Sequence, residues 1–218
     1  MAIKAFLFDL DGVIVDTAIY HYQAWRRLAN ELGFDISEEF NERLKGVSRM
    51  ESLDLILAEG GQTLSDERKL ELATQKNEWY LELVSRMTPD DILPGVAPFF
   101  SQVRKAGLHT ALGSVSKNAP LILERIGMGE VFDAVIDGNK ISKGKPDPEV
   151  FTKGAAELDV QPDECVVFED AVAGIEAGKR GGMHTVGLGS PDVLTQADMV
   201  APSLEHLTVE QVLARFNA

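Results

Sequence analysis

The sequence is poor in cysteine: it contains a single one, Cys165, inside an apolar run. A chain with one cysteine has no internal disulfide framework, which favours a reducing compartment. No apolar run reaches the length of about 18 residues that suggests a membrane span. The first residues do not combine a basic segment with a long apolar run, so we expect no signal peptide and a cytoplasmic location.

Positive charge is also scarce, because 21 Lys and Arg face 35 Asp and Glu and the formal net charge is -14. This balance argues against nucleic acid and anionic membranes as partners. It is compatible with a small anionic substrate, since a local basic pocket can lie inside an acidic surface. Internal repeats and low-complexity segments are absent, and 218 residues allow one large domain or one domain with a modest insertion.

What the sequence does contain is a short apolar run, residues 5–8, that ends at two acids. A run with little alternation is typical of a strand buried on both faces of a parallel sheet. Asp9 and Asp11 are two apart, so on an extended chain they point the same way, at the edge where α/β sheets bind ligands. Two unpaired carboxylates would repel each other there. Lys145 and Asp170 are plausible neighbours, and a divalent cation would offset the repulsion. The alternative is a strand end capped by two solvated acids.

Residues 17–87 form a helical, strand-poor block between this strand and the rest of the chain. The spacing of its apolar residues predicts helices near 17–32, 38–44, 48–59 and 65–86. The remainder alternates helices with strands expected at 108–112, 131–137, 165–168, 184–188 and 199–201. The predicted fold class is therefore α/β, with a catalytic core of residues 1–16 and 88–218. The helical block is the predicted cap domain, which would close over a substrate and exclude water.

Several candidate binding residues lie in this helical block. His21 and Trp25 are four apart and share one helical face, although packing alone explains such a pair. Residues 45–49, KGVSR, combine glycine, hydroxyl and basic groups at a helix start, which suits an anion. Arg49 can bind a phosphate with two hydrogen bonds, and a solvated loop is the alternative. Lys76 lies on the long helix, where a surface lysine is the default interpretation.

Further candidates follow the strands of the core. Residues 113–118, GSVSKN, lie between a strand end and a helix start, a context that binds phosphate, although Ser114 alone is also explained as a helix cap. Lys145 precedes two prolines that fix the backbone before a helix. Glu169 and Asp170 end another strand. Because parallel strands end at the same edge of a sheet, we expect these groups to lie near Asp9.

The order of these motifs resembles the haloacid dehalogenase superfamily: D-x-D-G after the first strand, then Ser114, a K-P-x-P lysine and an acidic pair. The resemblance implies a Rossmann-like core of parallel strands flanked by helices, with a small all-helical cap inserted after the first strand. It implies phosphoryl transfer in which Asp9 is the nucleophile and Asp11 the general acid–base. Ser114 and Lys145 would hold the transferring phosphate. The implied Mg²⁺ ligands are Asp9, Asp11 through its backbone carbonyl, Glu169 and Asp170.

Within the superfamily, the runs DLDGVIVDT, LKGVSR, SVSKN and GKPDPE resemble the enzymes that interconvert β-D-glucose 1-phosphate and glucose 6-phosphate. Such a mutase works through an aspartyl-phosphate and β-glucose 1,6-bisphosphate, its activator and intermediate. A second phosphate would then lie between Arg49 and residues 116–118. The expected substrate is a small phosphorylated sugar, and we expect the protein to be a monomer. Met50 and Val115 depart from the expected pattern and would affect sugar selectivity. The residues expected to contact substrate are Thr17, His21, Trp25, Lys45, Gly46, Val47, Ser48, Arg49, Lys76, Val115, Ser116, Lys117 and Asn118.

Two other functions remain open. A phosphatase on the same scaffold would use water in place of a sugar hydroxyl, with Arg49 as a specificity residue, and net phosphate release would identify it. A catalytically inactive binding protein on this fold is the second. The intact set of Asp9, Asp11, Lys145 and Asp170 argues against it.

Overall fold

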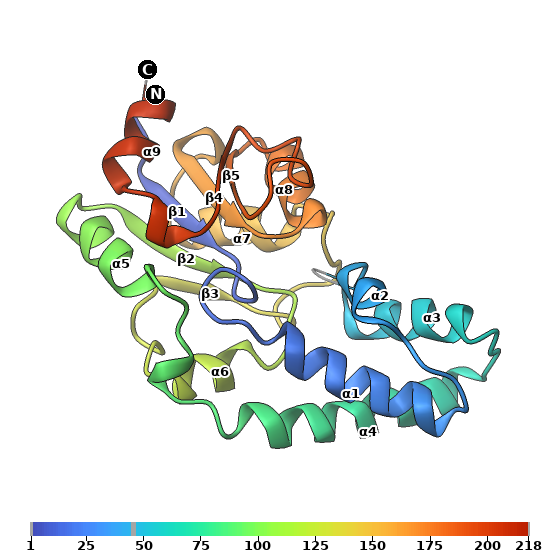
Figure 1. Cartoon of the computed structure of the whole chain (residues 1–218). Helices are drawn as coiled ribbons and strands as arrows, with labels where there is room; N and C mark the ends of the chain where they lie inside the picture. Colours follow the sequence, from blue (N-terminus) through green and yellow to red (C-terminus); the bar gives the residue numbers. More distant parts are fainter. Residues whose placement is uncertain (1, 45–46, 218) are drawn as a thin grey trace.

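A computed structural model describes residues 2–44 and 47–217, and within these residues six strands form one parallel sheet. The sheet order is β3-β2-β1-β4-β5-β6, with β1 between β2 and β4 (Figure 1). Strand order reverses at β1, so the crevice at its carboxyl end is the expected ligand site. The strands are β1 (Ala5–Phe8), β2 (His109–Gly113), β3 (Ala134–Ile136), β4 (Cys165–Glu169), β5 (His184–Leu188) and β6 (Met199–Ala201).

Helices cover both faces of this sheet, which the alternation of side chains along β1 explains. Phe6 and Phe8 point to one face and join Phe99 and Phe168 in an aromatic cluster, with the rings of Phe8 and Phe168 stacked at 4.7 Å. Leu7 points to the other face, in a separate buried cluster. The first face is covered by α5 (Val96–Lys105), α6 (Ala119–Arg125) and α9 (Val209–Phe216), and the second by α7 (Glu149–Glu157) and α8 (Val172–Arg180).

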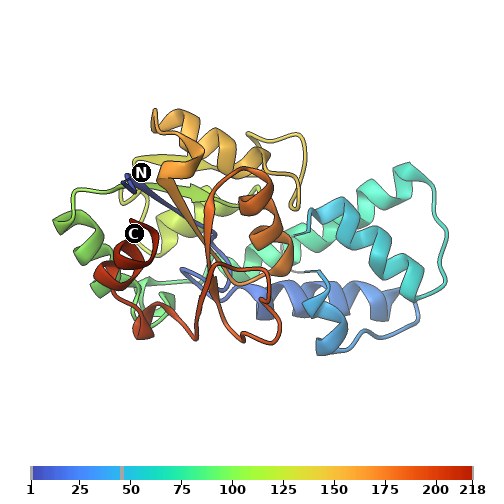
Figure 2. The ribbon, with the colours of Figure 1, turned by 90° about the horizontal axis from the view of Figure 1, so that it is seen from above.

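The remaining helices lie beyond the end of the sheet, as Figures 1 and 2 show from two directions. They have an apolar cluster of their own, which includes Trp25, Leu28, Phe40, Ile56 and Leu72. The long α4 packs along α1 and also contacts α3. These helices are α1 (Ala18–Glu31), α2 (Glu38–Glu42), α3 (Arg49–Glu59) and α4 (Asp66–Val84), and short 3-10 turns cover Pro89–Asp91, Pro162–Glu164 and Leu204–His206.

The α/β fold class with a parallel sheet is confirmed, while one predicted strand is much shorter than expected. The strand predicted at 131–137 covers only Ala134–Ile136. Phe132 instead packs its ring edge-on against Phe100, at 5.4 Å, and Asp133 accepts a hydrogen bond from the backbone of Thr110. The apolar start of this segment therefore serves loop packing rather than strand pairing.

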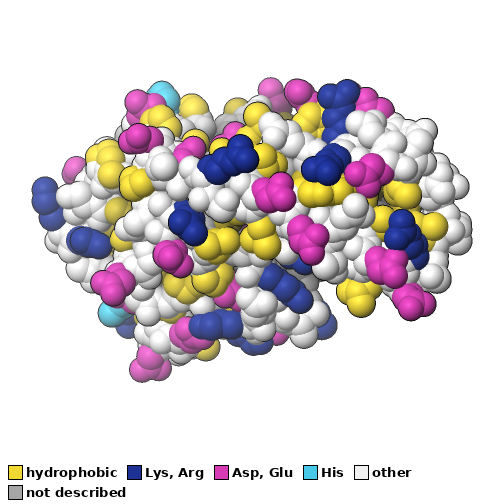
Figure 3. Space-filling view, turned by 90° about the horizontal axis from the view of Figure 1, so that it is seen from below, with side chains coloured by type: hydrophobic (Ala, Val, Ile, Leu, Met, Phe, Trp, Pro, Cys, Tyr) yellow, Lys and Arg dark blue, Asp and Glu magenta, His cyan; other side chains and the backbone are white. Residues whose placement is uncertain are grey.

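The surface agrees with the charge balance of the sequence. On the face shown in Figure 3, acidic and basic side chains are interspersed among small apolar areas. None of the helices that the structure describes is long and apolar enough to cross a bilayer.

Candidate active site

A buried lysine joins two of the strand-end acids. The Nζ atom of Lys145 lies 2.5 Å from Oδ1 of Asp9, directly after β1, and 2.5 Å from Oε1 of Glu169, at the end of β4. Burial lowers the pKa of Lys145, but the two carboxylates outweigh this effect and raise that pKa above its ordinary value. Lys145 therefore keeps its positive charge and offsets the repulsion between the acids.

Carboxylate oxygens of Asp9, Glu169 and Asp170 come together at this edge, all within 4.8 Å of one another. An oxygen-only donor set of this kind fits Mg²⁺ better than zinc. This approach of the carboxylates requires glycine at position 12. Its φ is +75°, and an added Cβ would lie 2.2 Å from Oδ2 of Asp170. The loop after Asp11 can therefore approach Asp170 only because Gly12 has no side chain.

Asp11 lies in a different environment from Asp9. Burial raises the pKa of Asp11 well above its ordinary value, and the negative charges of Asp9 and Asp170 raise it further. Its Oδ1 accepts a hydrogen bond from the hydroxyl of Thr17. At the start of α1, Asp16 accepts a hydrogen bond from the backbone of Ala18, which leaves the Thr17 hydroxyl free of any capping bond and able to donate to Asp11. A carboxyl whose pKa is raised suits a general acid, because it is protonated more readily than an ordinary aspartate.

A cavity of about 840 Å³ opens between this edge and helices α1, α3 and α4. Trp25, Met50, Leu70 and Ile141 give it apolar walls. Most of the residues expected from the sequence to contact metal or substrate line this cavity. They are Asp9, Asp11, His21, Trp25, Val47, Ser48, Arg49, Lys76, Ser114, Val115, Ser116, Lys117, Asn118, Glu169 and Asp170.

The loop after β2 is held by its own hydroxyl groups and by a neighbouring turn. Ser114 Oγ accepts a bond from the backbone of Ser116, and Ser116 Oγ accepts one from the backbone of Asn118. Gly138 packs so closely that an added Cβ would lie 2.2 Å from the carbonyl oxygen of Val115. The Asn118 side chain donates to Asn77 of α4 at 2.9 Å. The loop is thus fixed on the sheet side and tied to the helices across the cavity.

A buried cation–aromatic cluster forms the wall opposite. Lys76 Nζ lies 2.7 Å from Nδ1 of His21 and 4.3 Å from the ring centre of Trp25. Burial lowers the pKa of Lys76 well below its ordinary value, and the charge of Arg49 lowers it further. Burial and Lys76 likewise lower the pKa of His21. Lys76 is therefore not the surface lysine that its sequence context suggests by default.

The haloacid dehalogenase-like hydrolase family matches residues 3–182. The chain belongs to this family. It is 44% identical to β-phosphoglucomutase of Bacillus subtilis over 209 residues, 95% of this chain and 92% of that protein. The crystal structure of β-phosphoglucomutase from Clostridium difficile superimposes with a TM-score of 0.95 at 44% identity, covering 99% of this chain and 97% of that one.

Phosphatases of the same family are also related to this chain. Hexitol phosphatase A of Escherichia coli is 32% identical over 219 residues, 96% of this chain and 95% of that protein. The resemblance to β-phosphoglucomutases predicted from the sequence is confirmed, because the identity to them is higher and nearly end to end. Membership of the family, together with the oxygen-only cluster, implies Mg²⁺ as the cofactor.

Two described residues predicted from the resemblance, Thr17 and Lys145, are not among those that line the cavity. Thr17 and Lys145 are buried behind the wall, where they contact Asp11 and Asp9 respectively. Lys45 and Gly46 lie outside the described residues. The sequence reasoning in turn missed lining residues from several segments, among them Asn41, Ser52, Leu70, Ala73, Thr74, Pro202, Ser203 and residues 141–144. Helical spacing of three and four residues places Leu70, Ala73 and Thr74 on one face and could have found them.

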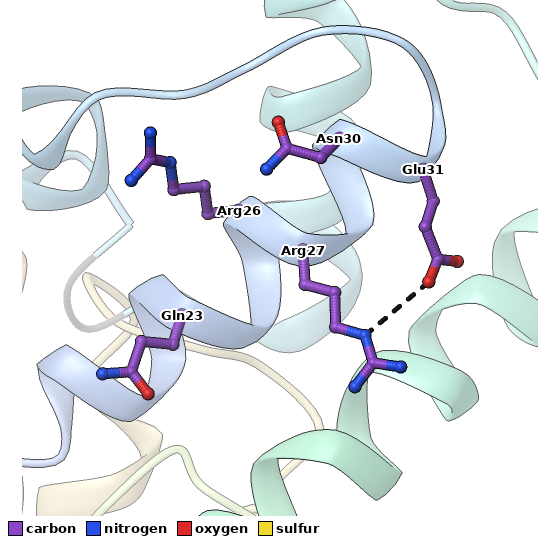
Figure 4. A pocket seen from close by; sticks show the side chains of 5 residues that line it. All are labelled: Gln23, Arg26, Arg27, Asn30 and Glu31. Carbon is purple, nitrogen blue, oxygen red and sulfur yellow. Dashed lines mark ion pairs between the residues drawn. The ribbon is translucent and has the colours of Figure 1, made fainter.

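A second hollow lies on the outer side of α1, lined by Gln23, Arg26, Arg27, Asn30 and Glu31 (Figure 4). It is open to solvent and its charges are paired. Arg27 Nε lies 3.6 Å from Glu31, and Arg26 makes a two-bond pair with Asp35 at 2.7 Å. None of the family's motif residues lies there, so we assign the chemistry to the larger cavity.

The buried position of Lys76 predicts a pH-dependent stability difference. The unfolded chain holds this proton up to the ordinary pKa of 10.5, whereas the folded protein releases it at lower pH. Wild-type stability should therefore rise with pH relative to Lys76→Met, because the unfolded state binds more protons in this window. Urea unfolding of both proteins at about pH 7 and pH 10, without substrate, measures the change. If the wild-type advantage in free energy of unfolding does not rise with pH, the pKa of Lys76 is not lowered by folding.

Proposed function

We propose that this chain is a Mg²⁺-dependent phosphomutase that interconverts β-D-glucose 1-phosphate and glucose 6-phosphate. One observation carries the proposal beyond the family relationship. The cavity that holds Asp9 and Asp11 is also lined by Arg49 and by residues 116–118, which together suit a second anion. A mutase that works through a bisphosphate needs two phosphate sites in one cavity, and a simple phosphatase needs one.

In the proposed mechanism, a carboxylate oxygen of Asp9 attacks phosphorus and the bond from phosphorus to the sugar oxygen breaks. Asp11 donates its proton to that leaving oxygen and later accepts one from the hydroxyl that attacks the aspartyl-phosphate. Lys145 and Ser114 hold the transferring phosphate, and Lys145 balances the charge of Asp9. Mg²⁺ held by Asp9, Asp170 and the Asp11 carbonyl, with Glu169 beside it, would neutralise phosphate charge when bound.

The second phosphate would be held by Arg49 and residues 116–118 while the first is transferred. The intermediate, β-glucose 1,6-bisphosphate, would then reorient in the cavity so that either phosphate can face Asp9.

We also propose that residues 17–87 act as the cap on a core of residues 1–16 and 88–218. In this assignment, Trp25 and residues 45–48 face the sugar, and His21 and Lys76 respond to closure. That the protein is a cytoplasmic monomer stays a prediction.

The competing function is hydrolysis of small sugar phosphates, which the relationship to Hexitol phosphatase A supports. One reaction separates the two functions. Purified protein is given Mg²⁺, β-glucose 1-phosphate and a trace of glucose 1,6-bisphosphate, and glucose 6-phosphate and free phosphate are followed together. We expect rapid glucose 6-phosphate formation that depends on the bisphosphate. Free phosphate without isomerisation would move the chain to the phosphatases.

Arg49 gives a sharper test of the second phosphate site. Arg49→Ala should lower kcat/KM for glucose 6-phosphate formation about 10- to 100-fold, because hydrogen bonds to a charged phosphate contribute roughly 1.5–3 kcal/mol. The ratio of free phosphate to glucose 6-phosphate should rise. Arg43→Ala is the matched control, since Arg43 is an exposed arginine next to α2 that lies 3.9 Å from Glu59. Equal losses in both variants would argue against a second phosphate site at Arg49.

A further inference from the structure

Residues 141–144 form a segment of the cavity wall that has no role in the proposed reaction. It lines the cavity and leads directly into Lys145. Its other side faces the start of α3, because a Cβ added to Gly144 would lie 3.4 Å from Oε2 of Glu51 and 3.8 Å from the backbone nitrogen of Ser48. This segment, which we name the strap, therefore lies between the catalytic lysine and the helix start that carries Arg49.

The strap has no helix or strand of its own, so other groups must fix it. The carboxylate of Glu149, in the first turn of α7, is the main group that fixes it. Its Oε2 accepts hydrogen bonds from the backbone of Ser142 at 2.9 Å, from the Ser142 hydroxyl at 2.9 Å and from the backbone of Lys143 at 2.8 Å. Its Oε1 lies 2.6 Å from Nζ of Lys153, which also donates to the carbonyl of Lys140 at 2.7 Å.

This arrangement ties the middle of the strap, and the residue before it, to one helix. The Glu149 side chain is only 18% exposed, and the Lys153 bond and the strap amides hold its pKa low, at about 2. Its carboxylate is thus ionised and fully engaged. Lys145 is the residue directly after the strap, and its Nζ lies 2.5 Å from both Asp9 and Glu169. A shift of the strap would disturb this geometry.

We propose that Glu149 is a positioning residue for phosphoryl transfer: it fixes the strap so that Lys145 is aligned with Asp9 on one side and α3 is seated on the other. The proposal rests on the proposed function for the roles of Asp9 and Lys145. Glu149 does not line the cavity among the described residues, and it acts through the strap. Its effect should therefore appear in the rate of transfer more than in substrate binding.

The test compares Glu149→Ala, Glu149→Gln and Asp198→Ala with the wild type. Asp198 is the matched control, because it accepts bonds from the Thr185 backbone and hydroxyl, pairs with Lys179 and is not among the described residues that line the cavity. At a temperature where all variants are folded, Glu149→Ala should lower kcat by about 10-fold or more, with KM changed much less. Glu149→Gln should recover part of kcat, since its amide oxygen can still accept from the strap. Asp198→Ala should lose stability but keep kcat.

Wild-type kcat in Glu149→Ala would overturn the proposal, as would an equal loss of kcat in Asp198→Ala. Phosphorylation of Asp9 by acetyl phosphate, followed by mass spectrometry, separates this outcome from failure of the proposed function. If the wild type proves to be a phosphatase, Glu149→Ala should still slow this phosphorylation, because Lys145 serves the same step. If Glu149→Ala is phosphorylated at the wild-type rate, the positioning role is wrong whatever the overall reaction is.

Discussion

Asp9→Asn should abolish turnover, with a fall in kcat on the order of 10⁴-fold or more, because an amide oxygen cannot form the phosphoryl-enzyme bond. The substitution keeps the size of the side chain, and Lys145 keeps Glu169 as a partner at 2.5 Å. We therefore expect a folded protein that still binds sugar phosphates. Formation of glucose 6-phosphate and phosphate incorporation into the protein, both followed with the bisphosphate present, measure the effect.

The control for this variant is Asp16→Asn. Asp16 is also a carboxylate of the cavity lining, but it lies outside the oxygen cluster and accepts a bond from the backbone of Ala18. It should keep activity within a few-fold of the wild type. Turnover that survives in Asp9→Asn, or a phosphate found on another residue, would refute the nucleophile assignment and with it the mechanism.

Local patterns were sufficient for the acidic edge of the sheet. The unbroken apolar run before Asp9 indicates a doubly buried strand, and the two-residue spacing to Asp11 depends on nothing outside that strand. Glu169 ends β4 and Asp170 follows it, and the parallel pairing of β4 with β1 brings both acids to Asp9. These features could be predicted because each depends on one strand and on a general rule about where strands end.

Contacts between distant helices and loops could not be predicted in this way. Helical spacing gives the faces of α1 and α4, but it does not show that these helices pack together and bury Lys76 against His21, 55 residues away. The strap was missed for a related reason. Residues 141–144 show no helical or strand periodicity in their apolar residues. Nothing in the sequence shows that the Glu149 side chain accepts hydrogen bonds from the backbone of Ser142 and Lys143.

Asp11→Asn should separate proton transfer from phosphate binding. Turnover of β-glucose 1-phosphate should fall about 10²- to 10⁴-fold, because the sugar oxygen leaves as a poor group unless it is protonated. Phosphorylation of Asp9 by acetyl phosphate should fall much less, since acetate leaves without a proton. Asparagine can still accept the hydrogen bond that the Thr17 hydroxyl donates to Asp11. Single-turnover phosphorylation of Asp9 by β-glucose 1,6-bisphosphate and by acetyl phosphate gives the comparison.

The ratio of the two rate losses decides between two roles for the Asp11 carboxyl. If Asp11 is the general acid, the loss with the sugar phosphate exceeds the loss with acetyl phosphate by a large factor. If its side chain only shapes the pocket beside Asp9 and Asp170, both donors lose rate together. The raised pKa of Asp11, caused first by burial and then by those two carboxylates, favours the first outcome, because a raised pKa makes this carboxyl easier to protonate and so better able to donate a proton.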